Sequence, residues 1–87
     1  MIYRILWRDH ALDDLNDLPA VIGLRISKKI ETHLARDPMK LGSPLTGQLS
    51  GLFRYRIGDY RVIYEIHRDQ LIIYVLRVGH RKDIYDE

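Results

Sequence analysis

A tight β-hairpin is predicted around Gly58-Asp59, because apolar and charged side chains alternate on both sides of a dipeptide that favours turns. A two-residue turn at this point puts Arg56 directly opposite Arg61, with Arg54 two residues further along the same face. Like charges that face each other across a ladder destabilise a sheet. The hairpin therefore carries a repulsion that a bound anion would relieve, and phosphate is the most obvious anion. An ordinary solvated sheet face is the alternative interpretation.

The chain before this hairpin is expected to form a short strand and two helices. Residues 2–7 are β-prone and predict the strand. Apolar residues at helical spacing over 11–18 predict a first helix that Asp9 caps, and Pro19 ends this helix or opens the next. Isoleucine or leucine at every fourth position over 22–34 predicts a second, amphipathic helix.

The pattern then changes from helices to strands. Asp37-Pro38 is expected to close the second helix, and the glycine-containing residues 39–51 are expected to form a loop. The leucines of this loop are expected to hold it against the domain: Leu41, Leu45 and Leu49. Beyond the loop the hydrophobic period becomes two. An antiparallel meander is therefore predicted, with strands at residues 52–57, 60–67 and 71–78.

These elements predict one α+β domain over residues 1–87, in which two N-terminal helices pack on one face of a small, mainly antiparallel sheet in the order β-α-α-β-β-β. The helix-covered face is predicted to carry Phe53, Tyr55, Ile57, Tyr60, Val62, Tyr64 and Ile66. The opposite face is predicted to carry Arg54, Arg56, Arg61, Ile63, Glu65 and His67. The last strand is apolar on both faces, so alternation leaves the direction of Arg77 open. We interpret six strand aromatics as core or half-buried residues, namely Tyr3, Trp7, Phe53, Tyr55, Tyr60 and Tyr64.

Composition excludes several classes of function. The chain has no cysteine, which excludes disulfides, thiol chemistry and cysteine-ligated metals. Its histidines lack the paired spacing of a zinc site, so we expect no metal and no cofactor: His10, His33, His67 and His80. No apolar run approaches about 18 residues and no charged leader precedes an apolar stretch, so we expect a cytoplasmic protein without a membrane association.

A second group of functional side chains follows the last predicted strand. Gly79 lets the chain turn there. The side chains that follow supply an imidazole, two cations and a phenol, from His80, Arg81, Lys82 and Tyr85. An imidazole can exchange a proton near neutral pH, and a phenol can stack on a base. A polar C-terminal tail would have a similar composition, so the segment alone leaves both interpretations open.

Two stretches of the sequence resemble the RelE-type toxins of the RelE/ParE superfamily, which are small bacterial and archaeal proteins. The first is Tyr-Arg-Val-Ile-Tyr at residues 60–64, similar to the family's Tyr-Arg-aliphatic-aliphatic-Tyr strand. The second is Val-Gly-His-Arg-Lys-Asp-Ile-Tyr at residues 78–85. The order of elements is similar over nearly the whole chain. The resemblance implies two helices packed against an antiparallel sheet, and a toxin of a type II toxin-antitoxin system.

The resemblance also implies an activity and the residues that perform it. Such toxins enter the ribosomal A site and cut mRNA by attack of the RNA 2′-hydroxyl on the adjacent phosphate, which leaves a 2′,3′-cyclic phosphate and a 5′-hydroxyl. By matching position, Arg61 and Arg81 would stabilise the charged phosphate and the leaving oxygen. Tyr85 would stack on or orient a base. The expected phosphate-binding residues are Arg54, Arg56 and Lys82.

One departure from the family concerns the proton acceptor. Arg54 and Arg56 occupy positions at which the best-known branch of the family carries lysines. Because an arginine stays charged, neither residue is a credible general base. We therefore hypothesise that His80 takes the proton of the 2′-hydroxyl. The unperturbed pKa of a histidine is about 6.5, so its neutral form can accept a proton near neutral pH. Alternatively, the reaction depends on positioning and charge stabilisation without a protein base.

The resemblance implies three partners, namely the ribosome, mRNA and a RelB-like antitoxin that forms a hetero-oligomer with the toxin and covers its basic face. Two other functions remain open at this point. A ParE-like inhibitor of gyrase has a similar architecture but performs no RNA chemistry. A non-catalytic RNA-binding or degenerate toxin domain would bind RNA in a salt-sensitive way without cutting it.

Overall fold

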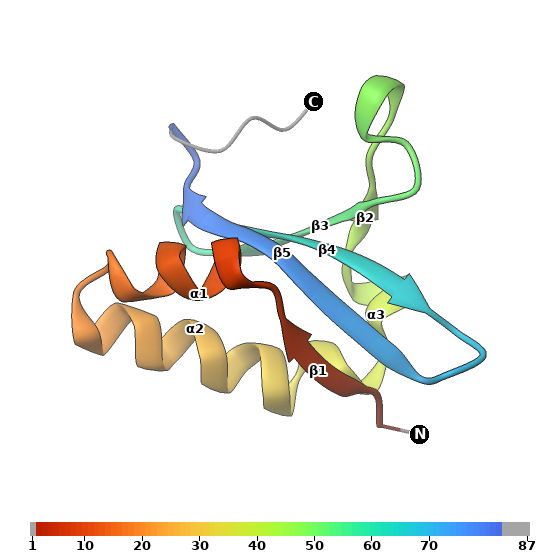
Figure 1. Ribbon diagram of the computed structural model, residues 1–87, viewed down its shortest axis with the longest axis horizontal. Coiled ribbons are helices and arrows are strands. Elements are labelled where there is room, and N and C mark those ends of the chain that lie inside the picture. The colour runs from red at the N-terminus through yellow and green to blue at the C-terminus, as the bar shows by residue number, and fades with distance from the viewer. Residues whose placement is uncertain (1, 83–87) are drawn as a thin grey trace.

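A five-stranded sheet with helices on one face forms the body of the molecule (Figure 1). The computed structural model describes residues 2–82. Its helical elements are α1 (Asp9–Asn16), α2 (Ala20–Thr32), the 3₁₀ turn η1 (Leu34–Arg36), α3 (Pro38–Leu41) and the 3₁₀ turn η2 (Gly47–Leu49). Its strands are β1 (Arg4–Trp7), β2 (Ser43–Pro44), β3 (Phe53–Ile57), β4 (Tyr60–His67) and β5 (Ile72–His80). The strand order is β1-β5-β4-β3-β2. The predicted α+β class, with an N-terminal pair of helices, is confirmed.

The β3–β4 hairpin has the predicted register. Arg56 is opposite Arg61, and Gly58 adopts a positive φ of 59° whereas Asp59 does not. This combination fits a type II′ turn, which takes glycine at its first central position. β4 and β5 then pair antiparallel, so the predicted meander is confirmed.

The N-terminal strand joins the sheet in the parallel direction. β1 pairs with β5, and Leu6 lies opposite Tyr74. The connection between these strands contains both long helices as well as β2, β3 and β4, and it is long enough to join parallel neighbours. Pairing continues one residue beyond the strand, because the N–H of Arg8 donates to the carbonyl oxygen of Val75 at 3.0 Å. The sheet is thus mainly antiparallel, with one parallel pair at its edge.

The first helix begins differently from the prediction. Arg8 is the N-cap of α1, with an extended backbone at φ −71° and ψ 155°, and Asp9 lies in the first turn. The prediction that Asp9 caps the helix is wrong, because the sheet holds the preceding residue extended and the helix starts at once. The carboxylate of Asp9 still lies near the helix N-terminus, where a negative charge is favourable.

The second helix ends earlier than predicted. α2 stops at Thr32, and Asp37-Pro38 opens α3, with proline in its first turn, instead of closing α2. The chain leaves the helix so that Ala35 is buried in η1. The carbonyl oxygen of Ala35 accepts the N–H of Tyr3 at 2.8 Å and ties this turn to the N-terminus.

The connector over 39–51 contains short elements where a plain loop was predicted. Leu45 is buried against Ile63 on the sheet face opposite the helices, and Leu49 packs beside them. Leu41 is exposed, so its predicted anchoring role is wrong. Two of the three leucines therefore attach the connector to the sheet, as expected.

A close approach between Gly42 and Tyr64 fixes where the connector meets the sheet. The Tyr64 hydroxyl donates to the carbonyl oxygen of Pro38 at 2.7 Å. A Cβ added at Gly42 would lie 1.8 Å from the hydroxyl oxygen of Tyr64. Only glycine therefore leaves room for the tyrosine to reach its acceptor.

The main core lies between the helices and the sheet. Its buried members are Ala11, Ile26, Ile30, Leu34, Tyr55, Ile57, Val62, Tyr64, Ile73, Val75 and Val78. Partly buried residues around them include Tyr3, Trp7, Phe53, Tyr60 and Ile66. The predicted helix-covered face and the core role of the strand aromatics are both confirmed. Among residues 2–82, no helix has the length and apolar character needed to span a membrane.

Candidate phosphate-binding face

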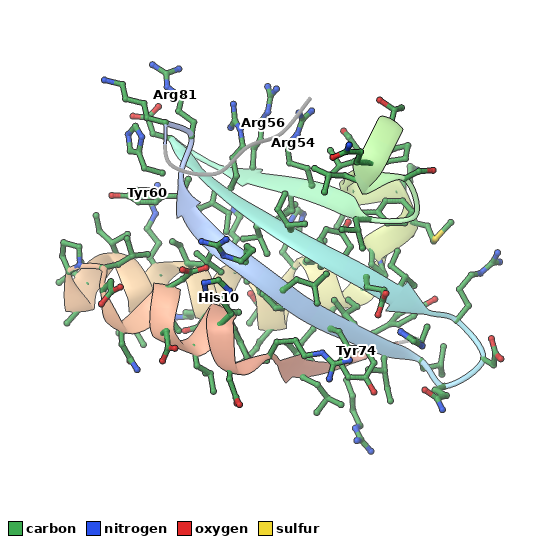
Figure 2. The ribbon with its side chains drawn as sticks, turned by 45° about the horizontal axis from the view of Figure 1, so that its top comes forward. His10, Arg54, Arg56, Tyr60, Tyr74 and Arg81 are labelled. Carbon is green, nitrogen blue, oxygen red and sulfur yellow. The ribbon has the colours of Figure 1, made fainter. Side chains whose placement is uncertain are left out.

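Guanidinium groups gather at the hairpin end of the sheet, on the face that the helices leave uncovered. We call Arg54, Arg56, Arg61 and Arg81 the arginine face. Alternation along β3 and β4 turns the first three to this side. Figure 2 shows Arg54, Arg56 and Arg81 projecting together away from the helices. Arg56 and Arg81 are exposed, whereas Arg54 and Arg61 are partly buried. The structure thus brings together four of the predicted site residues.

The turn of the hairpin holds the C-terminal arginine in place. The backbone N–H of Arg81 donates to the carbonyl oxygen of Asp59 at 2.8 Å. Two residues before Arg81, Gly79 of β5 lies opposite Arg61 of β4. Three strands therefore contribute to the arginine face, two through residues inside the strands and β5 through the residue that follows it. Lys82 comes next and is exposed. Tyr85 lies outside the described residues.

His80 lies at the end of β5 but turns to the other side of the sheet. It pairs with Tyr60, and the rings meet edge to face with centroids 5.5 Å apart. Because Tyr60 packs on the main core, this register directs the imidazole toward the helix side. Its Nδ1 accepts the backbone N–H of Lys82 at 3.2 Å. A neutral imidazole that accepts at Nδ1 carries its proton on Nε2.

Asp14 of α1 closes the edge of β5 beyond the end of β1. Its Oδ2 accepts the Nε–H of Arg77 at 2.8 Å and the backbone N–H of Val78 at 2.9 Å. Burial alone would raise the pKa of this carboxyl, but the bonds from Arg77 and Val78 outweigh it, and the pKa is lowered. The same bond raises the pKa of Arg77. Sequence alternation left the direction of Arg77 open, and the structure shows that it pairs with α1.

A separate cluster occupies the far end of the same uncovered face. We call Arg8, Glu65, His67 and Tyr74 the distal cluster. The guanidinium carbon of Arg8 lies 4.2 Å from the centroid of the Tyr74 ring. The His67 ring meets Tyr74 edge to face at 4.7 Å, and its Nε2 lies 2.7 Å from Oε1 of Glu65. Sequence analysis placed Glu65 and His67 on this face but missed Arg8 and Tyr74, which the parallel pairing of β1 brings there.

Three hollows formed by described residues lie away from the arginine face. One of about 350 Å³ lies between α1 and α2, and one of about 220 Å³ lies between α2 and the hairpin turn. A third, of about 260 Å³, lies where α1 meets the end of β5 and includes His80. No residue of the arginine face lines any of these three hollows.

Comparison with known proteins agrees with this fold. A family model described as the ParE toxin of the type II toxin-antitoxin system parDE matches residues 5–85. The chain is 36% identical over 85 residues to toxin RelG of Mycobacterium tuberculosis and covers 98% of both chains. It is 31% identical over 83 residues to toxin RelE of the same organism. That alignment covers 95% of this chain and 86% of the relative.

Solved structures show the same architecture. A chain of the toxin-antitoxin complex RelBE2 from Mycobacterium tuberculosis superposes with a TM-score of 0.90 at 34% identity, over 95% of each chain. A chain of the intact Escherichia coli RelBE complex matches in fold, with a TM-score of 0.75 at 19% identity over 90% of this chain and 95% of that one. The fold and the sequence define a toxin of the RelE/ParE superfamily. The chain belongs to the ParE toxin family of type II toxin-antitoxin systems.

Proposed function

We propose that this toxin is an endoribonuclease that cuts mRNA in the ribosomal A site and thereby inhibits translation in the cytoplasm. The observation that carries the proposal is the convergence of Arg54, Arg56, Arg61 and Arg81 on one end of the sheet face that the helices leave uncovered. Such a cluster suits a polyanion with several phosphates, since each phosphate that an arginine neutralises adds to affinity. Identity above 30% with toxins named RelG and RelE supports the RNA-cutting branch of the superfamily.

In the proposed reaction, the 2′-oxygen of RNA bonds to the adjacent phosphorus and the 5′-oxygen of the next nucleotide leaves. The products are a 2′,3′-cyclic phosphate and a 5′-hydroxyl; one proton departs from the 2′-hydroxyl and one arrives at the leaving oxygen. Negative charge builds on the phosphate during this exchange, and fixed guanidinium groups stabilise it. Arg61 is proposed to act on the phosphate oxygens and Arg81 on the leaving oxygen. No step of this reaction uses a metal ion.

The remaining site residues are proposed to hold the substrate. Arg54 and Arg56 face the same side as Arg61 and would bind neighbouring phosphates as fixed cations. Lys82 would add a further contact beside Arg81. Tyr85 is proposed to stack on or orient a base.

His80 is the proposed acceptor of the 2′-hydroxyl proton. The arginines cannot accept it, because they remain protonated. The imidazole can accept a proton only at Nδ1, where the N–H of Lys82 now donates. The ring also lies on the helix side of the sheet. The proposed role therefore requires the end of β5 to move off this nitrogen and to turn the ring toward the arginine face when RNA binds. If it does not move, catalysis depends on charge stabilisation and positioning alone.

The ribosome is the proposed positioning partner. A group of cations on a sheet face does not by itself hold a flexible RNA strand in a reactive geometry, and positioning accounts for a large part of such rate accelerations. The arginine face lines none of the three hollows described above. A ribosome that already holds mRNA extended in its A site would supply the missing order, and the arginines would then supply charge.

A RelB-like antitoxin is the proposed restraint on this toxin. The related chains in the RelBE2 complex and the Escherichia coli RelBE complex were solved as toxin-antitoxin assemblies. An acidic antitoxin segment on the arginine face would neutralise its repulsion and exclude RNA in one step. We therefore propose a toxin-antitoxin hetero-oligomer as the inactive form.

Mapping of mRNA ends in cells after brief expression tests the proposed function, with Arg81→Ala as the comparison. For the original sequence, we expect new 5′-hydroxyl ends within translated messages. For Arg81→Ala, we expect a strong loss of these ends. Messages that stay intact while growth stops would overturn the proposal.

Inhibition of gyrase is the second candidate, because the matching family model is described as a ParE toxin. This activity would need a protein-binding surface and no RNA chemistry. Purified toxin incubated with gyrase and relaxed DNA, and separately with translating ribosomes, separates the two candidates. Loss of supercoiling with intact mRNA would favour gyrase; cut mRNA with normal supercoiling would favour the ribosome. Salt-sensitive RNA binding without either effect would indicate a non-catalytic RNA-binding domain.

A further inference from the structure

The distal cluster holds the guanidinium group of an arginine over the face of an aromatic ring. Arg8 is fixed at both ends of its backbone, because its N–H donates to the Val75 carbonyl and its own carbonyl accepts the N–H of Leu12, each at 3.0 Å. Its guanidinium carbon lies 4.2 Å from the Tyr74 centroid, while the residue as a whole is exposed. Stacking thus orders a cation that would otherwise sample many rotamers, and leaves a planar, charged surface toward solvent.

Polar groups border this plane. His67 meets the Tyr74 ring at 76° and engages one carboxylate oxygen of Glu65, Oε1. Both side chains remain accessible, at 40% and 38% of their surface. A stacked planar cation beside an imidazole and a carboxylate resembles what proteins use to bind an unpaired base. The base stacks on the guanidinium or an aromatic ring, and its edge meets nearby donors and acceptors.

The distal cluster and the arginine face lie along one strand. On β4, Arg61 and Glu65 point to the same side, and Glu65 lies opposite Tyr74 of β5. Four residues of strand separate Arg61 from Glu65, which is about 13 Å. In Figure 2, Tyr74 lies toward the opposite end of the sheet from Arg54, Arg56 and Arg81. Between them, Ile63 is buried under Leu45 of the connector. A single RNA strand held at the arginines would therefore pass beside the connector, along β5, to bring a flanking nucleotide to the cluster.

We propose that Arg8, Tyr74, His67 and Glu65 form a base-recognition subsite for single-stranded RNA, which binds a nucleotide flanking the cut and sets the base preference there. The inference rests on the proposed ribonuclease function and names a specificity determinant for it. Arg8 supplies the stacking plane, Tyr74 orders that plane, and the Glu65–His67 pair meets the edge of the base.

The test compares Arg8→Lys with Arg4→Ala. Lysine keeps the charge of Arg8 but loses the plane. Arg4→Ala removes one charge from the same face of β1, opposite Ile72, away from the stack. Two readouts are measured: the base frequencies around cut sites in a translating-ribosome reaction, and the affinity of the protein for single-stranded RNA oligonucleotides of different base composition. Thermal melting of each variant reports on folding.

For Arg8→Lys we expect a flattened base preference at one flanking position and on the order of tenfold weaker binding of the preferred oligonucleotide. Tyr74→Leu should flatten the base preference and weaken binding in the same way. Tyr74→Phe keeps the aromatic ring and should retain the base preference of the original sequence. Arg4→Ala should leave the preference as it is, with a small loss of affinity that depends on salt.

Several results would overturn the subsite. One is an unchanged base preference in Arg8→Lys, and another is an equal effect of Arg4→Ala on base preference and RNA affinity. A third is a lower melting temperature in Arg8→Lys with unchanged RNA readouts, which would show that the cluster has a structural role. Weaker antitoxin binding with intact base preference would assign the cluster to the antitoxin. If the original sequence cuts no RNA, the proposed function fails, while oligonucleotide binding still decides the subsite. If all variants cut with one preference, the subsite fails and the ribonuclease stands.

Discussion

Arg81 donates its backbone N–H to the carbonyl oxygen of Asp59, at 2.8 Å. This bond joins the end of β5 to the turn between β3 and β4, and it brings a C-terminal guanidinium beside Arg56 and Arg61. Because the backbone makes the bond, the side chain of Arg81 can be replaced without removing the attachment. The site can therefore be tested separately from the fold.

Arg81→Ala should lower mRNA cleavage by on the order of a hundredfold or more, since loss of one donor to the charge that develops in a transition state has effects of this size. The matched control is Arg68→Ala, which removes an exposed arginine from the turn between β4 and β5. Cleavage in translating ribosomes and thermal melting are measured for both. A similar loss of cleavage in both variants would show that net charge alone matters.

Arg56→Thr should stabilise the protein in low-salt buffer by roughly 0.2–1 kcal/mol, because it removes one of two like charges that face each other. The gain should shrink in high salt, which screens the repulsion. Phosphate should stabilise the original sequence more than the variant, since an anion bound to the folded state adds to its stability. Arg4→Thr, which faces Ile72 and no cation, is the control. Thermal melting in the two buffers measures the effect. A loss of stability in Arg56→Thr would contradict the repulsion.

The hairpin illustrates how much of the fold the sequence predicts. A glycine-containing turn and alternation of period two are local signals, so the pairing of Arg56 with Arg61 follows from them directly. The end of α2 does not follow from local pattern. The helical period continues to Leu34, but the chain leaves the helix at Thr32 because tertiary contacts draw Ala35 into the core and bond it to Tyr3.

From alternation alone, the candidate site was predictable only where one hairpin supplies it. Arg54, Arg56 and Arg61 belong to two adjacent strands, so their common face can be read from alternation. The distal cluster depends on the parallel pairing of β1 with β5, which sequence pattern does not specify. The direction of His80 depends on the exact partner of a strand's last residue, and that partner, Tyr60, is set by the register of the whole meander.

His80→Gln should remove the limb that a histidine base contributes to the pH–rate profile around neutral pH. In the original sequence, cleavage should rise as the pH increases through this limb, because the base acts in its neutral form. Glutamine keeps a hydrogen-bonding side chain but cannot titrate. Single-turnover cleavage on ribosomes across this pH range measures the effect. An unchanged profile in the variant would remove His80 as the proton acceptor.

Asp14→Asn should destabilise the protein by on the order of 1 kcal/mol near neutral pH, since Arg77 is partly exposed and its pairing is screened. The pKa of Asp14 is lowered on folding, so the stability that its carboxylate adds is present above the ordinary value of 3.8 and is lost as the pH falls through the folded pKa. The gap between variant and original should therefore close below pH 3.8. Denaturant unfolding at several pH values measures it, with Asp13→Asn as control. A gap that does not depend on pH would contradict the assignment.

Gly42→Ala should destabilise the protein by about 1–3 kcal/mol or more, as overpacking does in a closed site. A Cβ at this position would lie 1.8 Å from the Tyr64 hydroxyl oxygen and 3.1 Å from the backbone oxygen of Arg54, so the tyrosine would have to leave its bond to Pro38. Gly23→Ala is the matched control, because its Cβ would approach Leu15 no closer than 3.4 Å and alanine favours a helix. Thermal melting should place Gly42→Ala well below the original sequence and Gly23→Ala near or above it. Equal melting temperatures for the two variants would show that the connector can move away from β4, and the close approach would then not fix its position.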